Sequence, residues 1–556
     1  MPGSWIGLVN QPTFHTSTMI LLTDGRVMAQ EEATPHWYAL APDSTGSYLN
    51  GTWSPLADMS FWRRYYASGV LKDGRVILIG GEQSGAGGDT NRGEIYDPVS
   101  DTWSPIPSPP GWSQVGDASC CVLPDGRFMI GALLSPSCVI YDPSTNSWSP
   151  VASKAVRSNE ETWVLLPDHT IVTLQCWAPY QTEKYIISSN TWKNEGALPV
   201  TLVDPVMHEI GPGMLMYNGK VIFFGAANSK GFGKTAIYTP PSSPTGTGTW
   251  MAGPDIPKVG GQTIVCNDCS ASLLPNGKVL FAAAPYLFNN WGSPILFFEY
   301  DPASNTISQA LTPPNNGVQL YWNRFILLPT GQVLFSPSSN NVQCYTPDSG
   351  PEEAWRPTIS AVTPYGTPYA TDYYLLKGTQ LNGLSQANMY GDDCYASTNY
   401  PLVRLQSTLT NNVYYCRTHD FSTMGVATGP SLQSVRFNAQ NVPYGHYDLC
   451  VIANGISSHC ISYCHHRPKK SCGCETRGKH GHEGYGREVC EDPCCCEETV
   501  IDPEIVELKE QLKRLQSSVY RLASLTRIAA PVREAKETRK AEETEEDGKE
   551  GKSKRK

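Results

Sequence analysis

The sequence predicts an all-β protein whose main part is a seven-bladed β-propeller, and three observations lead to this prediction. Apolar residues make up 40% of the 556-residue chain and charged residues only 17%, while glycine, proline, tyrosine and tryptophan number 49, 44, 28 and 14. Few charges, many aromatic residues and frequent turn formers are typical of β-proteins, and they exclude a coiled-coil rod or a disordered chain for most of the length. The other two observations are a sequence motif that recurs seven times, called the repeat phrase below, and a hairpin motif that accompanies it.

The repeat phrase consists of an apolar run, a tight turn and a second apolar run, as in SGVLKDGRVILIGG at Ser68. Asp-Gly or Asn-Gly between two β-rich runs indicates a hairpin, and we expect type I′ turns with positive φ at both central residues. The turns are 43 to 58 residues apart, which fits one four-stranded blade per repeat, whereas unrelated hairpins of a sandwich would not recur so regularly. The turn positions are Gly25, Gly74, Gly126, His169, Gly219, Gly277 and Gly331.

A second hairpin follows in most repeats, for example IYDPVSDTW ending at Trp103 and VIYDPSTNSW ending at Trp148. We expect its tyrosine side to form the third strand and its tryptophan to open the fourth strand and pack between blades. The first residues, GSWIGLVNQP, resemble the fourth-strand phrase near Trp53. The N-terminal strand is therefore expected to complete the last blade and close a propeller of residues 1–355, which leaves no exposed sheet edge.

Residues 356–463 lack the repeat phrase and show short alternating strands, which predict an immunoglobulin-like β-sandwich. Two cysteine pairs lie in this region, Cys450 with Cys460 and Cys394 with Cys416. Each pair is either a disulfide or two buried thiols.

Residues 464–500 form a Cys/His-rich segment, with seven cysteines and four histidines between positions 464 and 496. Such a composition cannot bury an ordinary core, so zinc binding and disulfide cross-linking between chains are the two alternatives. The spacing does not match a standard zinc finger. The candidate zinc ligands are Cys472, Cys474, Cys494, Cys496, His480 and His482.

Residues 501–530 are expected to form a coiled-coil helix, because apolar residues from Ile505 to Leu522 alternate at spacings of three and four. Fewer than three heptads are marginal alone, so we expect a homo-oligomer that the neighbouring cysteines help to hold. A helix packed against its own chain is the alternative. Residues 531–556 are mostly charged and contain no aromatic residue, which predicts a disordered tail.

The charge and the apolar pattern exclude some partners. The net charge of −10 argues against nucleic-acid binding, and no apolar run approaches the roughly 18 residues of a membrane helix. The N-terminal MPGSWIGLVNQP does not resemble a secretory signal. We therefore expect synthesis in the cytoplasm, whereas the 18 cysteines favour later exposure to oxidant in a particle or a surface assembly.

Candidate functional residues follow from the repeat. In a propeller, the loops that enter the innermost strands line one mouth of the axial channel, where function usually gathers. Counting back nine residues from each turn position gives one candidate per blade: Thr16, Tyr65, Asp117, Glu160, Ile210, Asp268 and Trp322. Carboxylates that converge there repel unless they are hydrated, protonated or share a cation; hydrogen bonds to loop backbone amides are the alternative. Their near neighbours include His15, His208, Glu209 and Tyr321.

The seven repeats, the closing strand and the following sandwich resemble the galactose oxidase and glyoxal oxidase family of kelch-type propellers over residues 1–465. The phrases LYWNRFILLPTGQVLF and NVPYGHYDLCVIANGISS resemble phrases of that family. The resemblance implies copper held by two tyrosines and two histidines, with one tyrosine cross-linked to a cysteine. On this basis Tyr321 matches the axial tyrosine, Trp322 replaces the adjacent histidine and Tyr395 replaces the histidine of the sandwich loop.

Two alignments of the remaining copper ligands are open. By blade order, Tyr65 takes the cysteine position and Asp117 the second tyrosine position, whereas a local match of RRYYASGVLKDGRV places Tyr65 on that tyrosine. Under both alignments the two histidines and the cross-linked cysteine are absent. Since an indole nitrogen cannot bind copper as an imidazole does, we expect no copper and no copper-radical chemistry.

The sequence therefore predicts a noncatalytic binding or structural and assembly module, with a protein partner or a glycan at the propeller mouth. The candidate binding residues are Tyr65, Asp117, Glu160, Asp268, Trp322 and Tyr395. One alternative is an enzyme, either a divergent oxidase that uses Tyr321, Tyr65 and Asp117 or a hydrolase that uses the acidic mouth. The other is a carbohydrate-binding module in which exposed aromatic rings stack on sugars. Two further cysteines, Cys266 and Cys269, lie near the predicted mouth of the propeller channel. We expect them to be buried thiols, and a redox or metal-binding role is the alternative.

Overall fold

The computed structural model describes residues 3–85, 87–227, 231–365, 372–389 and 396–465. The described residues all lie in one compact unit of the chain. Within the described ranges nearly all regular structure is β-strand, and helix is limited to three short 3-10 turns: Ile187–Ser189, Leu320–Trp322 and Glu353–Trp355. None of the described helices has the length and apolarity to cross a membrane.

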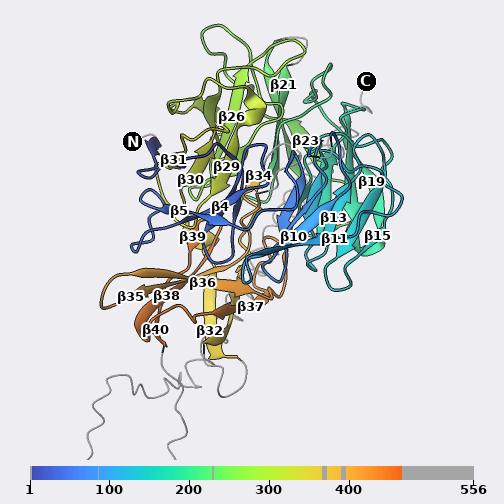
Figure 1. The fold of residues 1–556 in the computed structure, drawn as a ribbon. Helices are drawn as coiled ribbons and strands as arrows, with labels where there is room; N and C mark the ends of the chain where they lie inside the picture. The colour runs from blue at the N-terminus through green and yellow to red at the C-terminus, as the bar shows by residue number, and fades with distance from the viewer. Residues whose placement is uncertain (1–2, 86, 228–230, 366–371, 390–395, 466–556) are drawn as a thin grey trace, which may run out of the picture. The chain divides into compact units, whose positions relative to one another are not determined.

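Seven antiparallel sheets of four main strands follow one another along the chain, coloured from blue through green to yellow in Figure 1. Blades one to three consist of β2 (Thr16–Leu21), β3 (Val27–Glu31), β4 (Trp37–Ala41) and β5 (Thr52–Leu56); β7 (Ala67–Val70), β8 (Val76–Ile79), β10 (Gly93–Asp97) and β11 (Thr102–Ile106); and β12 (Cys120–Val122), β13 (Phe128–Gly131), β14 (Cys138–Asp142) and β15 (Ser147–Pro150). Blades four and five consist of β16 (Val164–Leu165), β17 (Thr170–Leu174), β18 (Gln181–Ile186) and β19 (Thr191–Ala197); and β20 (Gly213–Leu215), β21 (Val221–Ala227), β22 (Gly233–Thr239) and β23 (Thr249–Ala252).

Blade six consists of β25 (Ala271–Leu273), β26 (Val279–Pro285), β27 (Leu296–Asp301) and β28 (Thr306–Gln309), with β24 (Ile264–Val265) paired to β26. Blade seven consists of β29 (Arg324–Leu327), β30 (Val333–Ser336), β31 (Gln343–Thr346) and β1 (Ser4–Gly7). The short strands β6 (Arg63–Arg64) and β9 (Gln83–Ser84) form a separate ribbon beside blade two. The predicted closure is confirmed, because β1 pairs antiparallel with β31 as the outer strand of the last blade.

The repeated turns differ from the type I′ turns that the sequence predicted. In the first of them, the N–H of Gly25 donates to the carbonyl of Leu22, and φ is positive at Gly25 but not at Thr23 or Asp24. This is a turn with ordinary backbone angles followed by one left-handed residue, the three-residue hairpin that ends in a glycine bulge. Gly25 is required at this point because its φ is 82°. Asp24 supports the turn by accepting a hydrogen bond from the N–H of Arg26 at 3.1 Å.

The fourth-strand tryptophans pack between blades, as predicted. In five blades the indole N–H donates to a backbone carbonyl at the end of the preceding blade, which satisfies the one polar group of a largely apolar side chain. These bonds are Trp53 to Asn10 (3.1 Å), Trp103 to Ala57 (2.9 Å), Trp148 to Pro107 (2.6 Å), Trp250 to Glu195 (3.1 Å) and Trp5 to Leu311 (2.7 Å). Trp5 on the N-terminal strand β1 makes this contact between blades six and seven.

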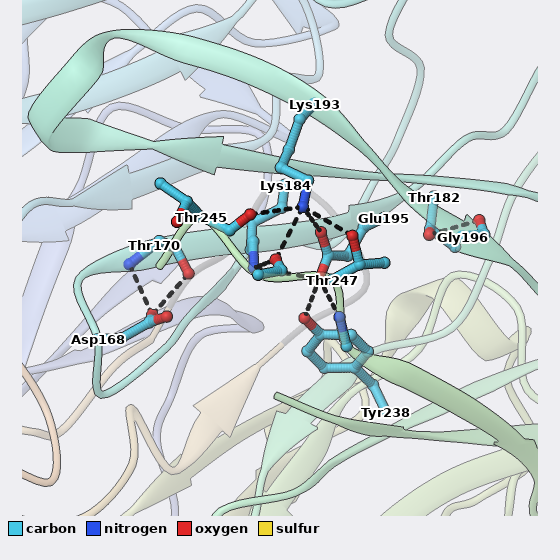
Figure 2. Close-up of polar contacts among 12 residues, drawn as sticks. Asp168, Thr170, Thr182, Lys184, Lys193, Glu195, Gly196, Tyr238, Thr245 and Thr247 are labelled. Carbon is cyan, nitrogen blue, oxygen red and sulfur yellow. Dashed lines mark hydrogen bonds and ion pairs between the residues drawn. The ribbon is translucent and has the colours of Figure 1, made fainter. Parts of the chain in front are cut away.

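A buried charge network joins blades four and five on their outer side (Figure 2). The carboxylate of Glu195 on β19 accepts hydrogen bonds from Tyr238 Oη and from the N–H of Gly248, both at 2.6 Å. It also pairs with the Nζ atoms of Lys184 at 3.1 Å and Lys193 at 3.3 Å. Because these residues come from two blades, the network ties one blade to the next.

The chain after the propeller forms a separate antiparallel sheet of eight strands, coloured yellow to orange in Figure 1. Its strands are β32 (Thr358–Pro364), β33 (Tyr373–Thr379), β35 (Leu402–Ser407), β36 (Val413–His419), β37 (Leu432–Asn438), β38 (Gly445–Ala453), β39 (Ile456–Ser457) and β40 (Ile461–His465), while β34 (Asn388–Met389) pairs with β25 of blade six. Cys450 and Cys460 form a disulfide. The immunoglobulin-like assignment and the domain boundaries stay predictions.

This region contacts the end of the propeller that carries the repeated turns. The N–H groups of Thr418, Phe421 and Met424 donate to the carbonyls of Thr23, Lys72 and Pro124, at 3.0, 3.1 and 2.9 Å. Each acceptor belongs to the turn of one of the first three blades. The C-terminal region is thus hydrogen-bonded to the turns of the first three blades.

Several sequence predictions lie outside the described residues: Cys394, Tyr395, the zinc candidates Cys472, Cys474, Cys494, Cys496, His480 and His482, the helix of residues 501–530 and the tail of residues 531–556.

Candidate functional site at the propeller axis

The predicted axial residues lie at one end of the ring. Thr16 is the first residue of β2, and the other six each precede the innermost strand of their blade by two to four residues. We call this end, where loops enter the innermost strands, the axial face. Two clusters of side chains form on it, one aromatic and one acidic.

The aromatic group consists of Tyr65, Trp291, Tyr321 and Trp322. The rings of Tyr65 and Tyr321 meet edge to face with centroids 6.3 Å apart. Tyr321 also contacts Trp291 at 4.9 Å and Trp322 at 5.4 Å between centroids. The guanidinium of Arg324 lies 5.8 Å from the centre of the Tyr65 ring, which is within range of a cation–π interaction. All four rings are half-buried, so each keeps an edge or a face toward solvent.

Arg64 links this group to the outer loops. Its guanidinium lies 5.6 Å from the ring centre of Trp322 and 6.0 Å from that of Trp62. It pairs with the carboxylate of Glu32 and donates to Gln83 Oε1 at 2.9 Å. Arg64 is therefore neutralised and fixed by its own neighbours, and it supports Trp322 from the side.

The acidic group consists of Glu160, Glu209 and Asp268, from the loops before blades four, five and six. Glu160 and Glu209 share a side-chain hydrogen bond, and Asp268 and Glu82 lie close enough to influence Glu160 electrostatically. Two carboxyl groups can share such a bond only if one of them carries a proton. Trp291 Nε1 donates to Glu209 Oε2 at 2.8 Å, and this bond joins the acidic group to the aromatic group.

The pKa of Glu160 is raised. Burial raises it well above its ordinary value, and the negative charges of Glu209 and Asp268 and the hydrogen bond with Glu209 raise it further. Protonation is one of the ways in which converging carboxylates can lie close together, and the raised pKa of Glu160 favours it.

We expect the raised pKa of Glu160 to make stability depend on pH. The pKa of Glu160 is higher in the folded than in the unfolded chain, so the folded protein loses stability as the pH rises from the ordinary glutamate range through the raised pKa. Glu160→Gln cannot ionise and should melt above the wild type at neutral pH but not at acid pH. Thermal midpoints measured between about pH 4 and about pH 8 test this. The control is Asp255→Asn, because that carboxylate is 42% exposed. A constant difference between wild type and Glu160→Gln at every pH would contradict the prediction.

The other predicted positions have different surroundings. Thr16 is buried, and its Oγ1 donates to the carbonyl of Ser339 at 3.0 Å, so it belongs to the junction of blades one and seven. Asp117 is also buried, in the loop before β12. His15 is exposed.

Trp291 was missed by the sequence analysis. It lies between β26 and β27, in a loop that joins the second and third strands of blade six, whereas the counting considered only loops that enter a first strand. No motif in the sequence marks it.

The expectation that Cys266 and Cys269 are two buried thiols is wrong. Both are fully buried, and they form a disulfide with only two residues between the cysteines. Asp268 lies inside this short loop and has the left-handed backbone conformation, with φ 52°.

Residues 63–110, which include all four strands of blade two, match the family model of the Kelch motif. A galactose oxidase from Gibberella zeae is 44% identical over 57 residues, which are 10% of this chain and 8% of that protein. The kelch-like protein terF of Aspergillus terreus is 29% identical over 123 residues, 22% of this chain and 26% of that protein. The chain thus contains a Kelch motif and is similar to a galactose oxidase over a short stretch.

The matched stretches of this kelch-repeat protein span only 8% and 26% of the two relatives' own length. Among solved structures, a fungal alcohol oxidase of the AA5 family in complex with copper is 13% identical, with a TM-score of 0.49 over 84% of this chain and 99% of that one. A virginiamycin B lyase from Staphylococcus aureus is 10% identical, with a TM-score of 0.44 over 62% of this chain and 99% of that one. Both likenesses are too weak to carry an argument about function.

The axial face differs from the two tyrosines and two histidines that the resemblance to galactose oxidase implies. The two tyrosines are close together, as the local alignment requires of residues that would share one metal. However, an indole stands at position 322, and His208 is stacked on Trp177 with ring centroids 3.9 Å apart. Among the described residues no cluster of three or more His, Cys, Asp or Glu side chains has the geometry of a metal site. Beside Tyr65 and Tyr321, the described axial face thus offers an indole where the resemblance implies an imidazole, and an indole nitrogen does not bind copper as an imidazole does.

Proposed function

We propose that the axial face of this kelch-repeat protein is a noncatalytic binding site. The observation that carries the proposal is the direct contact between the aromatic and the acidic group, made by the bond from Trp291 Nε1 to Glu209 Oε2 at 2.8 Å. Binding sites combine apolar and aromatic surface with a few polar groups that fix orientation, and both kinds meet here. The replacement of an imidazole by the indole of Trp322 removes a metal ligand and supplies apolar surface in its place.

The ligand that best fits this surface is a glycan, and a protein partner is the second candidate. Aromatic rings that are half-buried offer flat faces to the apolar side of a sugar, and carboxyl groups accept and donate hydrogen bonds to hydroxyls. The raised pKa of Glu160 favours a protonated carboxyl, which supplies a donor as well as an acceptor.

Copper loading tests the noncatalytic part of the proposal. The full chain and the variant Tyr65→Phe/Tyr321→Phe are incubated with copper(II), desalted and measured by metal mass spectrometry. Equal copper in the two proteins and no alcohol-dependent hydrogen peroxide are expected. The comparison with the variant is needed because the Cys/His-rich segment can bind metal by itself. Copper that is lost with the two tyrosines, together with peroxide formation, would show an oxidase site at the axis.

Glycan binding tests the other part. The wild-type chain is applied to a printed panel of oligosaccharides, and the tightest one is titrated by calorimetry. Trp322→Ala should weaken its affinity at least about tenfold, as expected for a central aromatic contact. Tyr365→Ala is the matched control, since Tyr365 is 41% exposed and directly follows β32 of the C-terminal sheet. If no oligosaccharide binds, or if both variants bind equally well, the glycan is the wrong ligand.

The assembly part of the proposal rests on residues 464–530. We propose that the coiled-coil segment and the cysteines before it join several chains, so that each assembly presents several axial faces. Light scattering of the full chain and of the variant Leu508→Pro/Leu515→Pro, with and without reductant, tests this. A monomeric wild-type chain under both conditions would exclude it.

A further inference from the structure

The disulfide loop of blade six lies where the two halves of the axial face meet. Cys266 follows β24 directly, and Cys269 comes two residues before β25, so the loop is the entry into the innermost strand of that blade. Both sulfur atoms belong to residues with no exposed surface. Asp268, the acidic residue of this loop, is one of the charges that raise the pKa of Glu160.

Backbone hydrogen bonds fasten the loop to blade five. The N–H of Cys266 donates to the carbonyl of Gly225 at 3.1 Å, and the N–H of Asp268 donates to the carbonyl of Ile210 at 2.9 Å. Gly211 packs directly on the disulfide, because a Cβ atom at this position would lie 3.0 Å from Cys266 Sγ and 2.6 Å from its carbonyl oxygen. The position of Asp268 relative to the loop of Glu209 therefore depends on the shape of the cross-linked loop.

On its other side, the loop is hydrogen-bonded to the chain that enters blade seven. The N–H of Ser270 donates to Asn323 Oδ1 at 3.0 Å, and Ser270 Oγ donates to the carbonyl of Asn323 at 3.2 Å. Asn323 directly follows Trp322 and precedes β29. One loop of five residues thus fixes both an acidic residue and the backbone that carries the aromatic group.

We propose that the Cys266–Cys269 pair is an oxidation-dependent switch that assembles the axial face. In the disulfide form the loop is closed, Asp268 is held in its left-handed conformation beside the acidic group, and Asn323 is held behind the aromatic group. In the dithiol form the cross-link is absent, and the loop is free to leave the conformation that a short ring imposes. The inference rests on the proposed function only in taking the axial face as the ligand site.

The chemistry is thiol–disulfide exchange with a small-molecule disulfide. One cysteine thiolate attacks the oxidant and forms a mixed disulfide, with release of the first small thiol. The second cysteine then displaces the remaining small thiol and forms the Cys266–Cys269 bond. Two electrons pass from the cysteine pair to the oxidant, and the two protons end on the released thiols. The close spacing of the two cysteines favours the second step, because closing a short loop costs little entropy.

Hydrogen exchange of the full chain, followed by mass spectrometry of its peptides, tests the switch. The protein is oxidised with glutathione disulfide or reduced with dithiothreitol, and differential alkylation reports the state of each cysteine. The variant Cys266→Ala/Cys269→Ala isolates this pair from the other cysteines, and Cys450→Ala/Cys460→Ala is the matched control for loss of a disulfide elsewhere.

Reduction and the Cys266→Ala/Cys269→Ala variant should each accelerate exchange at least about tenfold in the peptides that hold Asp268 and Ser270. The Cys450→Ala/Cys460→Ala variant should leave these peptides unchanged. Equal protection in the oxidised, reduced and Cys266→Ala/Cys269→Ala proteins would overturn the proposal, and so would a pair that stays reduced under glutathione disulfide. Because no ligand takes part, a failure of the proposed glycan binding would not change this result.

Discussion

Replacement of Glu195 by alanine should lower the free energy of unfolding by about 3 to 5 kcal/mol, the usual cost of removing one partner from a buried ion pair. The carboxylate has no exposed surface, and neither has the side chain of Lys184. Without Glu195, the Lys184 ammonium keeps a hydrogen bond to the carbonyl of Gly246 at 2.8 Å but no negative charge. Tyr238 Oη and the N–H of Gly248 lose their acceptor at the same time. Urea unfolding followed by tryptophan fluorescence measures the loss.

The effect of this substitution should depend on pH. Burial acts to raise the pKa of Glu195, but the hydrogen bonds from Tyr238, Gly248 and Lys184 outweigh it, and the pKa is lowered. A carboxylate with a lowered pKa stabilises the folded state above its unfolded pKa and ceases to do so as the pH falls through the folded value. The difference between wild type and Glu195→Ala should therefore shrink in acid.

Asp255→Ala is a suitable control for the charge itself. Asp255 pairs with Lys234 at 2.5 Å, but its side chain is 42% exposed, so its loss should cost less than about 1 kcal/mol. If Glu195→Ala were no more destabilising than Asp255→Ala, the network of Figure 2 would not tie the two blades together.

The blades could be predicted from the sequence because their signals are local and repeated. A glycine at positive φ between two apolar runs, and a tryptophan at the start of a fourth strand, each follow from interactions within one or two neighbouring blades. The turn type could not be predicted in the same way. Asp-Gly suits both a type I′ turn and a turn that ends in a glycine bulge, and only the backbone angles at Thr23 and Asp24 distinguish them.

Equivalent positions in the repeat predicted which residues face the axis, but not which of them interact. Glu160 and Asp268 were found by counting. Their relation to Glu209, one residue before the equivalent position Ile210, depends on the three-dimensional course of three loops. The disulfide of Cys266 and Cys269 could not be inferred either, since two nearby cysteines are equally compatible with free thiols.

A second buried ion pair lies directly beneath the axial face. Lys154 comes from the loop after blade three, and its Nζ pairs with Glu161 and lies 3.8 Å from Glu183, both of blade four. The side chains of Lys154 and Glu161 have no exposed surface. Since Glu161 follows Glu160 in the chain, this pair holds the backbone from which the Glu160 carboxyl of the acidic group extends.

We expect Lys154→Met to lower the free energy of unfolding by about 3 to 5 kcal/mol at neutral pH, because two carboxylates of blade four lose their buried cation. Burial already raises the pKa of Glu161, against the opposing effect of Lys154. Removal of Lys154 raises that pKa further, so the variant gains a proton at Glu161 as the pH falls. Its deficit relative to wild type should therefore be largest at neutral pH and decrease in acid, whereas the cost of a simple cavity would not depend on pH.

The double variant Lys154→Met/Glu161→Gln separates the charge from the packing. It has the same methionine but no ionised carboxyl at position 161, so it should be more stable at neutral pH than Lys154→Met alone, and its deficit should vary less with pH. A double variant that is as unstable as the sum of the two single variants would show that Lys154 and Glu161 are not coupled. Such a result would also remove the reason to regard blade four as the rigid support of Glu160.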